Sequence, residues 1–419
     1  MKLKPSPTQE NNTLNRLGDV PEHWQAKRLK YAFLLQRGFD LPVEDFVEGP
    51  YPVCGSNGII GYHNQYAALG PSVTIGRSGS VGEVNYFENN CWPHNTALYV
   101  KQYFQSYPKF VYYLLKIIDL KSLSEGTAVG TLNRNHIHNL MIVVPPSKEQ
   151  KTIADYLDEK SENIDSLISK KQRQIQLLQE KRSTLISHVV TKGLDLNAKM
   201  KDSGVEWLGE VPKHWEVQKL KYNSYIKGRV GWQNLRSEEF TDFGPFLVTG
   251  MHFKDGDVDW SACFHITEDR YVMAPEIYVK VGDILITKDG SIGKLAFISS
   301  IPGKASLNSH LLIIRPNKET YYPRFMYHLL ASNVFQHFIL REQSGTTFYG
   351  LSQESIENFP ALFPPFDEQK RIAYFLDKET ISIDKTIQII HTSILKLQEY
   401  RSALISAAVT GKIDMRQEA

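Results

Sequence analysis

The sequence predicts an α+β protein built from one unit that occurs twice. Each unit holds a mixed α/β domain and a long helix, and the two helices pair antiparallel as a coiled coil about a pseudo-two-fold axis. Three observations support this. Residues 145–195 return at 364–414 without a gap, and 24 of 51 positions are identical. Residues 17–31 return at 208–222 with 9 of 15 identical. Between these repeats the apolar pattern changes to short runs bounded by Gly, Pro and Asn, as is typical of strands.

The long repeat predicts two helices with an apolar seam. Each copy opens with Pro-Pro and then runs without Pro or Gly to Gly193 or Gly411, a plausible C-cap. Apolar residues recur every seven positions, as in a coiled coil. Two core helices of unrelated domains are the alternative, but such helices rarely exceed about 25 residues. Lys171 interrupts the seam, which consists of Leu157, Ile164, Leu178, Leu185, Leu376, Ile383, Ile390, Leu397 and Leu404.

Shorter echoes between the repeats set the domain boundaries. GSVGEV at 79–84 is similar to GSIGKL at 290–295, and YPKFVYYLL at 107–115 is similar to YPRFMYHLL at 322–330. The spacing shows that about twenty extra residues enter the second copy between Tyr222 and Gly290. We therefore expect a first domain at 1–146, a central helix at 147–195, a linker at 196–207, a second domain at 208–365 and a C-terminal helix at 366–411.

The two domains are expected to contain mainly strands. One helix is expected in each, starting at Pro108 and Pro323, because proline suits the first helical position. The sheets are expected to be antiparallel or mixed. The predicted strands lie in YPVCG, IIGYHN, SVTIG, VGEVNYF and TALYVK of the first copy, and in FGPFLVTG, GDILITKDG, KLAFISS and HLLIIRP of the second.

Composition narrows the class of protein. The 419 residues are 42% hydrophobic and 22% charged, with no apolar run long enough to span a membrane and no signal-like N-terminus. Three cysteines without paired spacing suit a reducing cytoplasm, where we expect the protein to be. A pI near 8.2 neither demands nor excludes a nucleic-acid partner.

Motifs for catalysis are missing. The sequence has no phosphate-binding GxxxxGK[ST] and no HExxH, and His136 and His138 stand two apart in an expected loop. The glycines from Gly76 to Gly82 have the wrong spacing for a dinucleotide site, and a tight hairpin turn is favoured. The Pro-Pro pairs lack the preceding Asn or Asp that amino-methyltransferases use. No metal site or cofactor is therefore expected in this chain.

Several of these segments together resemble a known family. They are WLGEVPKHWEV, GSIGK, QSGT…LSQESI and PPFDEQKRIAYFLD…LQEYRSALISAAVTGKID. This combination resembles specificity subunits of type I restriction–modification systems over nearly the whole chain. The resemblance implies a non-catalytic subunit whose two target-recognition domains each read half of a split DNA sequence. It also implies helices that dock two methyltransferase subunits, a restriction/translocase subunit that joins them, and S-adenosylmethionine, ATP and Mg²⁺ in those partners.

The repeat points to DNA recognition independently. Two domains on a helical pair of ~65 Å would read two half-sites, as DNA-binding dimers do. The two domains share the repeated segments but differ in sequence between them. The two half-sites of the double-stranded DNA should therefore differ. A coiled-coil scaffold for proteins, a stand-alone repressor and a self-sufficient methyltransferase are the alternatives.

Three loops in each domain are the predicted DNA-binding elements. They pair Arg77-Ser78 with Lys288-Asp289, His94-Asn95 with Asn308-Ser309, and 127–134 with 346–353. Arg134 and Gln353 suit base edges, whereas Arg77 and Lys288 suit phosphates. Solvated loop tips are the alternative. The candidate residues are Arg77, Ser78, His94, Asn95, Thr127, Thr131, Asn133, Arg134, Lys288, Asp289, Asn308, Thr346, Thr347, Tyr349, Ser352 and Gln353.

The helix starts also repeat a polar triplet. Glu149, Gln150 and Lys151 match Glu368, Gln369 and Lys370. These residues are candidates for holding the partner subunits, or for capping their own helices, where acidic side chains suit the first turn.

Overall fold

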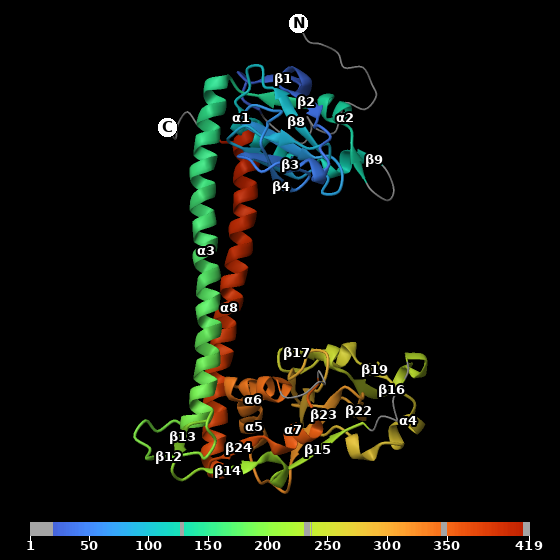
Figure 1. Cartoon of the computed structure of the whole chain (residues 1–419), viewed down its shortest axis with the longest axis vertical. Helices are drawn as coiled ribbons and strands as arrows, with labels where there is room; N and C mark the ends of the chain where they lie inside the picture. Colours follow the sequence, from blue (N-terminus) through green and yellow to red (C-terminus); the bar gives the residue numbers. More distant parts are fainter. Residues whose placement is uncertain (1–19, 126–129, 230–234, 236, 345–349, 414–419) are drawn as a thin grey trace. The chain divides into compact units, whose positions relative to one another are not determined.

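A computed structural model describes residues 20–125, 130–229, 235, 237–344 and 350–413 (Figure 1). The chain divides into two compact units. Unit 1 comprises residues 1–172 and 391–419, and unit 2 comprises residues 173–390. Each unit therefore combines one globular domain with parts of both long helices, α3 (Ser147–Lys192) and α8 (Phe366–Val409).

Unit 1 contains a four-stranded and a three-stranded sheet. The larger has the order β2-β8-β5-β6 and is antiparallel throughout, whereas β3 and β7 pair in parallel in the smaller sheet, β4-β3-β7. The bounds are β2 (Leu34–Arg37), β3 (Tyr51–Gly55), β4 (Gly58–His63), β5 (Ser72–Gly76), β6 (Val84–Phe87), β7 (Trp92–Pro93) and β8 (Ala97–Gln102).

Unit 2 repeats this topology. Its four-stranded sheet has the order β15-β23-β20-β21, and its three-stranded sheet, β19-β16-β22, again contains one parallel pair. The mixed sheets predicted from the sequence are thus present in both units. The bounds are β15 (Ser224–Gly228), β16 (Thr241–Val248), β19 (Phe264–His265), β20 (Ile284–Thr287), β21 (Leu295–Phe297), β22 (Ala305–Leu307) and β23 (Leu311–Pro316).

One helix packs on each four-stranded sheet. These are α1 (Pro108–Ile117) and α5 (Pro323–Leu330), and each begins at its proline as predicted. Phe110 and Phe325 are fully buried at equivalent positions, each in the main core of its unit. The expectation of one helix per domain was too low. The structure adds α2 (Arg134–His138), α4 (Glu268–Val272), α6 (Asn333–Ser344) and α7 (Gln353–Asn358).

The two units differ most in one connection. In unit 1 the strands β3 and β4 are joined by Ser56 and Asn57 alone, whereas in unit 2 residues 249–263 separate β16 from β19. This longer connection contains a small antiparallel hairpin, β17 (Phe253–Lys254) and β18 (Asp257–Val258). It accounts for much of the extra sequence predicted between Tyr222 and Gly290.

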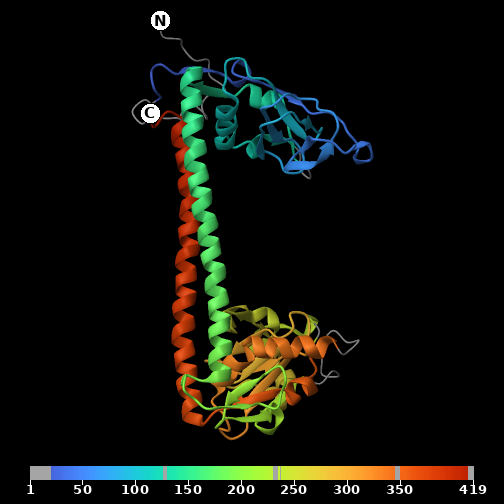
Figure 2. The ribbon, with the colours of Figure 1, turned by 60° about the vertical axis from the view of Figure 1, so that its left-hand side comes forward.

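The long helices run side by side and antiparallel within each unit (Figures 1 and 2). In unit 1, α3 residues 153–157 pack against α8 residues 404–409, and Asp165 pairs with Arg401. In unit 2, α3 residues 186–190 pack against α8 residues 372–376, and Arg182 pairs with Asp384 at 3.0 Å.

The predicted seam positions face this contact. Leu157, Ile164, Leu376, Ile383, Ile390 and Leu404 are buried, and Leu178, Leu185 and Leu397 are half-buried. Lys171 is also half-buried, which fits a lysine whose stem packs along the seam while its ammonium reaches water.

A pair of strands joins each domain to the start of its long helix. β1 (Gln25–Arg28) pairs with β11 (Met141–Val144), and β14 (Glu216–Lys219) pairs with β24 (Pro360–Phe363). The predicted linker is partly ordered by β12 (Met200–Asp202), which pairs with β13 (Glu210–Pro212). The VPxHW sequences at residues 20–24 and 211–215 are followed directly by β1 and β14, the first strands of these pairs.

Candidate DNA-recognition site

A glycine-rich hairpin turn forms the first part of the site in both units. Gly79 and Gly82 have positive φ values of 83° and 82°, and Gly290 and Gly293 have 65° and 79°. The N–H of the last glycine closes each turn, from Gly82 to the Gly76 carbonyl oxygen and from Gly293 to that of Thr287. Glycine adopts such angles without steric cost. The predicted hairpin is therefore confirmed, and it connects two strands rather than a strand and a helix.

Backbone hydrogen bonds attach two further segments to this turn. In unit 1 the Arg77 N–H donates to the Thr96 carbonyl at 2.8 Å, and the Leu132 N–H donates to the Arg77 carbonyl at 2.9 Å. In unit 2 Lys288 stands in the place of Arg77. Its N–H donates to the His310 carbonyl at 3.0 Å, and its carbonyl accepts from the Leu351 N–H at 2.6 Å. The described parts of the three predicted loops thus meet at one junction in each unit.

A short capped helix follows the third segment. The Asn133 side chain accepts from the Asn135 N–H at the start of α2, and the Ser352 hydroxyl accepts from the Ser355 N–H at the start of α7. Side-chain caps of this kind stabilise a helix start by roughly 1 kcal/mol. The expectation that His136 and His138 lie in a loop was wrong, since both belong to α2.

Arg134 and Gln353 are the first helical residues of α2 and α7. Arg134 is exposed, whereas Gln353 is half-buried and donates to the Glu357 carboxylate at 2.7 Å. Thr131 and Ser78 face each other in an isolated antiparallel bridge. The predicted residues Thr127, Thr346, Thr347 and Tyr349 lie outside the described residues.

The polar side chains at the junction differ between the units. In unit 1 the Arg77 guanidinium donates to the Asn95 carbonyl oxygen at 3.3 Å, and the Asn95 amide donates to Asp40. His94 Nδ1 lies 3.0 Å from the Thr96 hydroxyl. In unit 2 His310 Nδ1 lies 2.7 Å from the Asp289 carboxylate, and Asn308 accepts from the His310 N–H at 3.2 Å. Equivalent backbone positions therefore present different hydrogen-bonding groups.

Sequence reasoning missed several residues around the junction of unit 2. A cavity of about 470 Å³ there is lined by Asp289 and Asn308, which were predicted, and by Met251, Phe264, Lys294 and His310, which were not. His310 could have been inferred from its place two residues after Asn308. Met251 lies in the extra segment, and without an equivalent in the first copy the repeat gave no signal for it.

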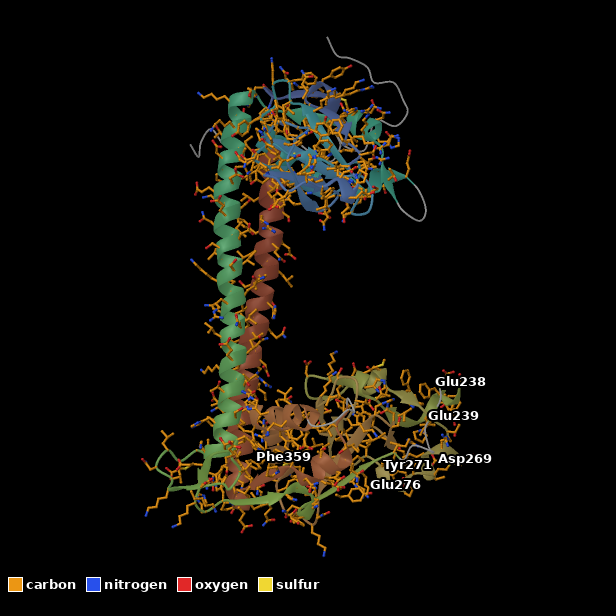
Figure 3. All side chains as sticks on the ribbon, in the orientation of Figure 1. Glu238, Glu239, Asp269, Tyr271, Glu276 and Phe359 are labelled. Carbon is orange, nitrogen blue, oxygen red and sulfur yellow. The ribbon has the colours of Figure 1, made fainter. Side chains whose placement is uncertain are left out.

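Another part of unit 2 is acidic. Glu238, Glu239, Asp269 and Glu276 come from the elements between β15 and β20, around Tyr271 (Figure 3). Of these, Glu239 pairs with Arg270 at 2.9 Å. Carboxylates repel DNA phosphates, so this surface is less suited to DNA than the junction that carries Lys288 and Lys294.

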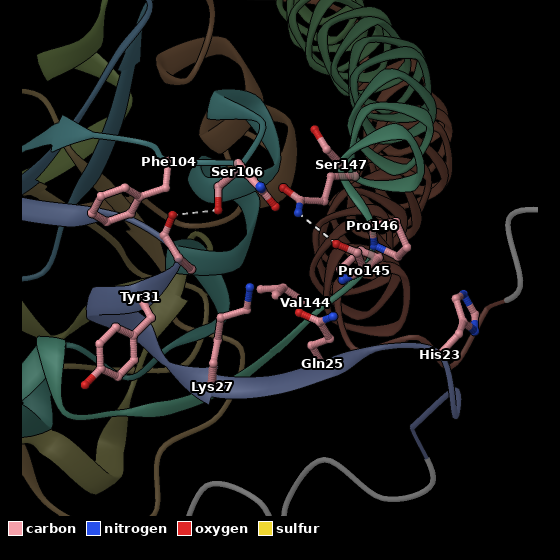
Figure 4. A pocket seen from close by; sticks show the side chains of 13 residues that line it. His23, Gln25, Lys27, Tyr31, Phe104, Ser106, Val144, Pro145, Pro146 and Ser147 are labelled. Carbon is pink, nitrogen blue, oxygen red and sulfur yellow. Dashed lines mark hydrogen bonds between the residues drawn. The ribbon is translucent and has the colours of Figure 1, made fainter.

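The helix starts use their repeated polar residues internally. The Gln150 side chain accepts from the Tyr107 N–H and donates to the Pro145 carbonyl, both at 2.8 Å. Figure 4 shows Pro145 and Pro146 beside the cavity at the start of α3. Gln369 makes the equivalent bonds to Tyr322 and Pro364, at 2.8 and 2.7 Å. Both glutamines are at most 3% exposed.

The neighbouring acids follow the same pattern. Glu149 lies 2.8 Å from His23 Nε2 and accepts from the Trp24 indole at 3.1 Å, and Glu368 lies 2.8 Å from His214 Nε2. The glutamate side chains therefore connect each long helix to its own VPxHW segment (residues 20–24 and 211–215), and the glutamine side chains connect it to the residue that precedes α1 or α5. These contacts within the chain favour an internal role over a contact with partner subunits.

Comparison with known proteins identifies the family. A family model described as "Type I restriction modification DNA specificity domain" matches residues 21–177 and, a second time, residues 223–399. The chain belongs to this family. Each match covers one copy of the repeat, so the internal duplication is a duplication of the specificity domain.

Similar proteins carry the same description. The type I restriction enzyme MjaVIII specificity subunit of Methanocaldococcus jannaschii is 26% identical over 313 residues, which cover 73% of this chain and 70% of the relative. The EcoBI specificity subunit of Escherichia coli is 19% identical over 313 residues, covering 73% of this chain and 65% of the relative.

Two solved structures show the same fold. A chain from work on complex assembly and conformational transition of the type I R-M system has a TM-score of 0.73 at 16% identity, covering 94% of this chain and all of that one. The HsdS subunit from Thermoanaerobacter tengcongensis has a TM-score of 0.54 at 16% identity, covering 94% and 98%.

Membership defines the general role of the protein. Type I specificity subunits recognise the DNA target and act together with other subunits, which carry the catalysis. In this specificity subunit the junctions of units 1 and 2 are the best candidates for that contact. Across the described ranges, no helix is long and apolar enough to cross a bilayer.

Proposed function

We propose that each unit reads one half of an asymmetric, bipartite DNA target through its three-segment junction. The supporting observation is that the same backbone hydrogen bonds join the three segments in both units, while the side chains at the equivalent positions differ. Arg77 and Lys288 occupy the same backbone position, as do Thr96 and His310, and Arg134 and Gln353. A common frame presents both units to DNA in the same way, and differing side chains read different bases.

The long helices are proposed to dock two methyltransferase subunits, one for each unit, and through them the restriction/translocase subunits. Support comes from exposed apolar side chains on the helices, among them Leu167 and Leu177 of α3 and Tyr374 and Ile389 of α8. Large apolar side chains exposed on these helices offer contacts for a partner protein. S-adenosylmethionine, ATP and Mg²⁺ would then be bound by those partners.

Co-expression with a methyltransferase subunit of the same system tests this proposal. The purified complex should contain two methyltransferase subunits per chain by light scattering, and it should protect a specific duplex from nuclease digestion. One methyltransferase per chain at saturation would contradict the symmetric arrangement. Full, specific protection of the same duplex by this chain alone would instead favour a stand-alone DNA-binding protein.

A further inference from the structure

An aromatic and basic cluster lies at the same place in both units. In unit 1 the Tyr86 and Tyr112 rings are 5.8 Å apart, and the Lys109 ammonium lies 4.2 Å from the centre of Tyr86. In unit 2 Phe297 and Tyr327 replace the two tyrosines at 5.9 Å, and the Arg324 guanidinium lies 4.9 Å from the centre of Phe297. The cluster joins the edge strand, β6 or β21, to the helix α1 or α5.

In unit 2 a segment of the chain covers this cluster. The hairpin β17–β18 packs on β21, with Phe253 and Val258 buried in the same core as Ala296. The Phe297 N–H, on the outer edge of β21, donates to the Gly256 carbonyl oxygen at 2.8 Å. A Cβ on Gly256 would lie 2.3 Å from the Tyr327 hydroxyl, so only glycine fits against this ring.

In unit 1 the corresponding strand edge is open. The Val73 N–H donates to the Tyr103 hydroxyl at 2.9 Å and not to β6, so its cross-strand partner Tyr86 also directs its N–H away from β5. No described residue accepts a hydrogen bond from that N–H. The short turn at Ser56 and Asn57 lacks the hairpin that covers the matching position of unit 2. An unpaired strand edge is a template for another strand.

A cavity of about 630 Å³ lies beside this edge. Its lining includes Tyr86 and Tyr112, the basic residues Lys109 and Lys116, and the carboxylates Glu83, Asp158, Glu162 and Asp165. Three of these carboxylates are paired within the protein: Glu83 with Lys121 at 3.3 Å, Asp158 with Lys109 at 3.4 Å, and Asp165 with Arg401. Glu162 is exposed and has no ion-pair partner among the described residues. Glu162 occupies the position on α3 that Ile381 occupies on α8, so unit 1 carries an acidic group where unit 2 has an apolar one.

We propose that the outer edge of β6, together with α1 and α3, is a docking site for an extended, glycine-containing basic segment of a partner protein. The segment would add a strand to β6, with its backbone carbonyl accepting from the Tyr86 N–H and its glycine against Tyr112. Main-chain bonds would supply affinity, and the glycine and the Glu162 carboxylate would supply selectivity. The covering hairpin of unit 2 indicates the backbone geometry of this segment, and the exposed Glu162 carboxylate, in place of the apolar Ile381 of α8, indicates that the segment carries basic side chains.

Peptides derived from that hairpin test the site with the full chain. The probe is a fluorescent peptide of residues 249–260 in which Asp255, Asp257 and Asp259 are replaced by lysine. We expect saturable binding, slower hydrogen exchange at residues 84–87, and binding about tenfold tighter than that of the unsubstituted peptide. A probe that also carries Gly256→Val should bind about tenfold more weakly, because its side chain meets Tyr112.

Variants of the chain locate the binding. Glu162→Lys should weaken binding of the basic probe about tenfold, whereas the matched control Glu180→Lys, exposed on the same helix outside the cavity, should not change it. Several outcomes would overturn the proposal: no binding of any probe, equal binding of the valine probe, or equal effects of the two charge reversals. Displacement of the probe by duplex DNA would assign the surface to DNA. Tighter binding to a chain that starts at residue 20 would assign it to the chain's own N-terminal segment.

Discussion

The Leu132 N–H donates a hydrogen bond of 2.9 Å to the carbonyl oxygen of Arg77. This bond ties the start of α2 to the hairpin turn, and Leu351 and Lys288 repeat it in unit 2 at 2.6 Å. Leu132 and Leu351 are also buried, at no more than 1% exposure, so the core holds each junction in place. The side chains that follow, Arg134 and Gln353, therefore emerge from a fixed backbone.

Replacement of Arg134 by alanine should relax one position of the target. Arg134 is exposed at the first residue of α2, and its guanidinium can bind a guanine edge with two hydrogen bonds. Loss of such a contact should cost about 1–3 kcal/mol on the cognate site. Binding to a panel of single-base variants would measure this, with Gln353→Ala as the equivalent change in the other half-site. Equal affinity of both alanine variants for every duplex would exclude base readout by these two residues.

Replacement of Arg77 or Lys288 by alanine should act on all sequences alike. Both residues come just before the turn glycines, which allow close approach to the DNA backbone, and phosphate contacts carry no sequence information. Each variant should lower the slope of log affinity against log salt concentration by about 1. Affinities for cognate and scrambled duplexes at several salt concentrations provide the measurement. A loss confined to the cognate duplex would show a base contact instead.

Acidification should destabilise unit 2 through His328. Burial lowers the pKa of His328, helped by Arg324 and Arg182, although Asp377 at 2.8 Å from its Nε2 opposes the shift. The unfolded chain, with an ordinary histidine pKa of about 6.5, therefore binds the proton more readily than the folded one. The contribution of His328 to stability is present above pH 6.5 and is lost as the pH falls below it.

The variant His328→Tyr isolates this effect. Tyr113 stands at the matching position of unit 1 and donates to Asp158 at 2.6 Å, so a tyrosine suits the place without titrating near neutral pH. Urea unfolding of both proteins at pH 7.5 and pH 5.5 should show a smaller loss of stability for the variant. Identical losses would mean that other groups, such as the buried His138 and His252, account for the acid sensitivity.

Repetition in the sequence was sufficient to predict the frame. The two long helices, a strand in each of the nine segments named from the sequence, and the helices that start at Pro108 and Pro323 are all present. The strands β2, β7, β15, β19 and β22 were not predicted. Each predicted element has a local physical signal: a seven-residue apolar period, short apolar runs between turn residues, or a proline at the first helical position. The hairpin turn at Gly79 and Gly82 was also predictable, because closely spaced glycines are a local signal for a turn. Both glycines have positive φ angles in the structure.

The short helices were not predictable in this way. α2 has five residues, too few for a period, and it is held by the burial of Ile137 and by the Leu35 N–H, which donates to His138 at 2.9 Å. Its one local signal is the Asn133 cap. Long-range contacts also decided the role of Gln150, whose partner Tyr107 lies 43 residues away in the chain. Spacing along the sequence does not reveal such partners.

The DNA-contacting side chains remain predictions at the level of single residues. The structure brings Arg77, Asn95 and Arg134 of unit 1 into three adjoining segments, as the sequence suggested. Their contacts with bases depend on the duplex. The cavity beside Asp289 adds Met251 and His310 to the candidates in unit 2.

Exchange of one recognition domain tests the central claim most directly. Residues 32–144 contain the sheets and junction of unit 1, and both flanks belong to the repeated frame, so this segment can be replaced by the matching segment of a related specificity subunit. The chimera, expressed with its methyltransferase subunit, should methylate genomic sites in which one half-site is new and the other half-site and the spacer are unchanged. Methylated sites that change in both halves would contradict independent reading by the two units.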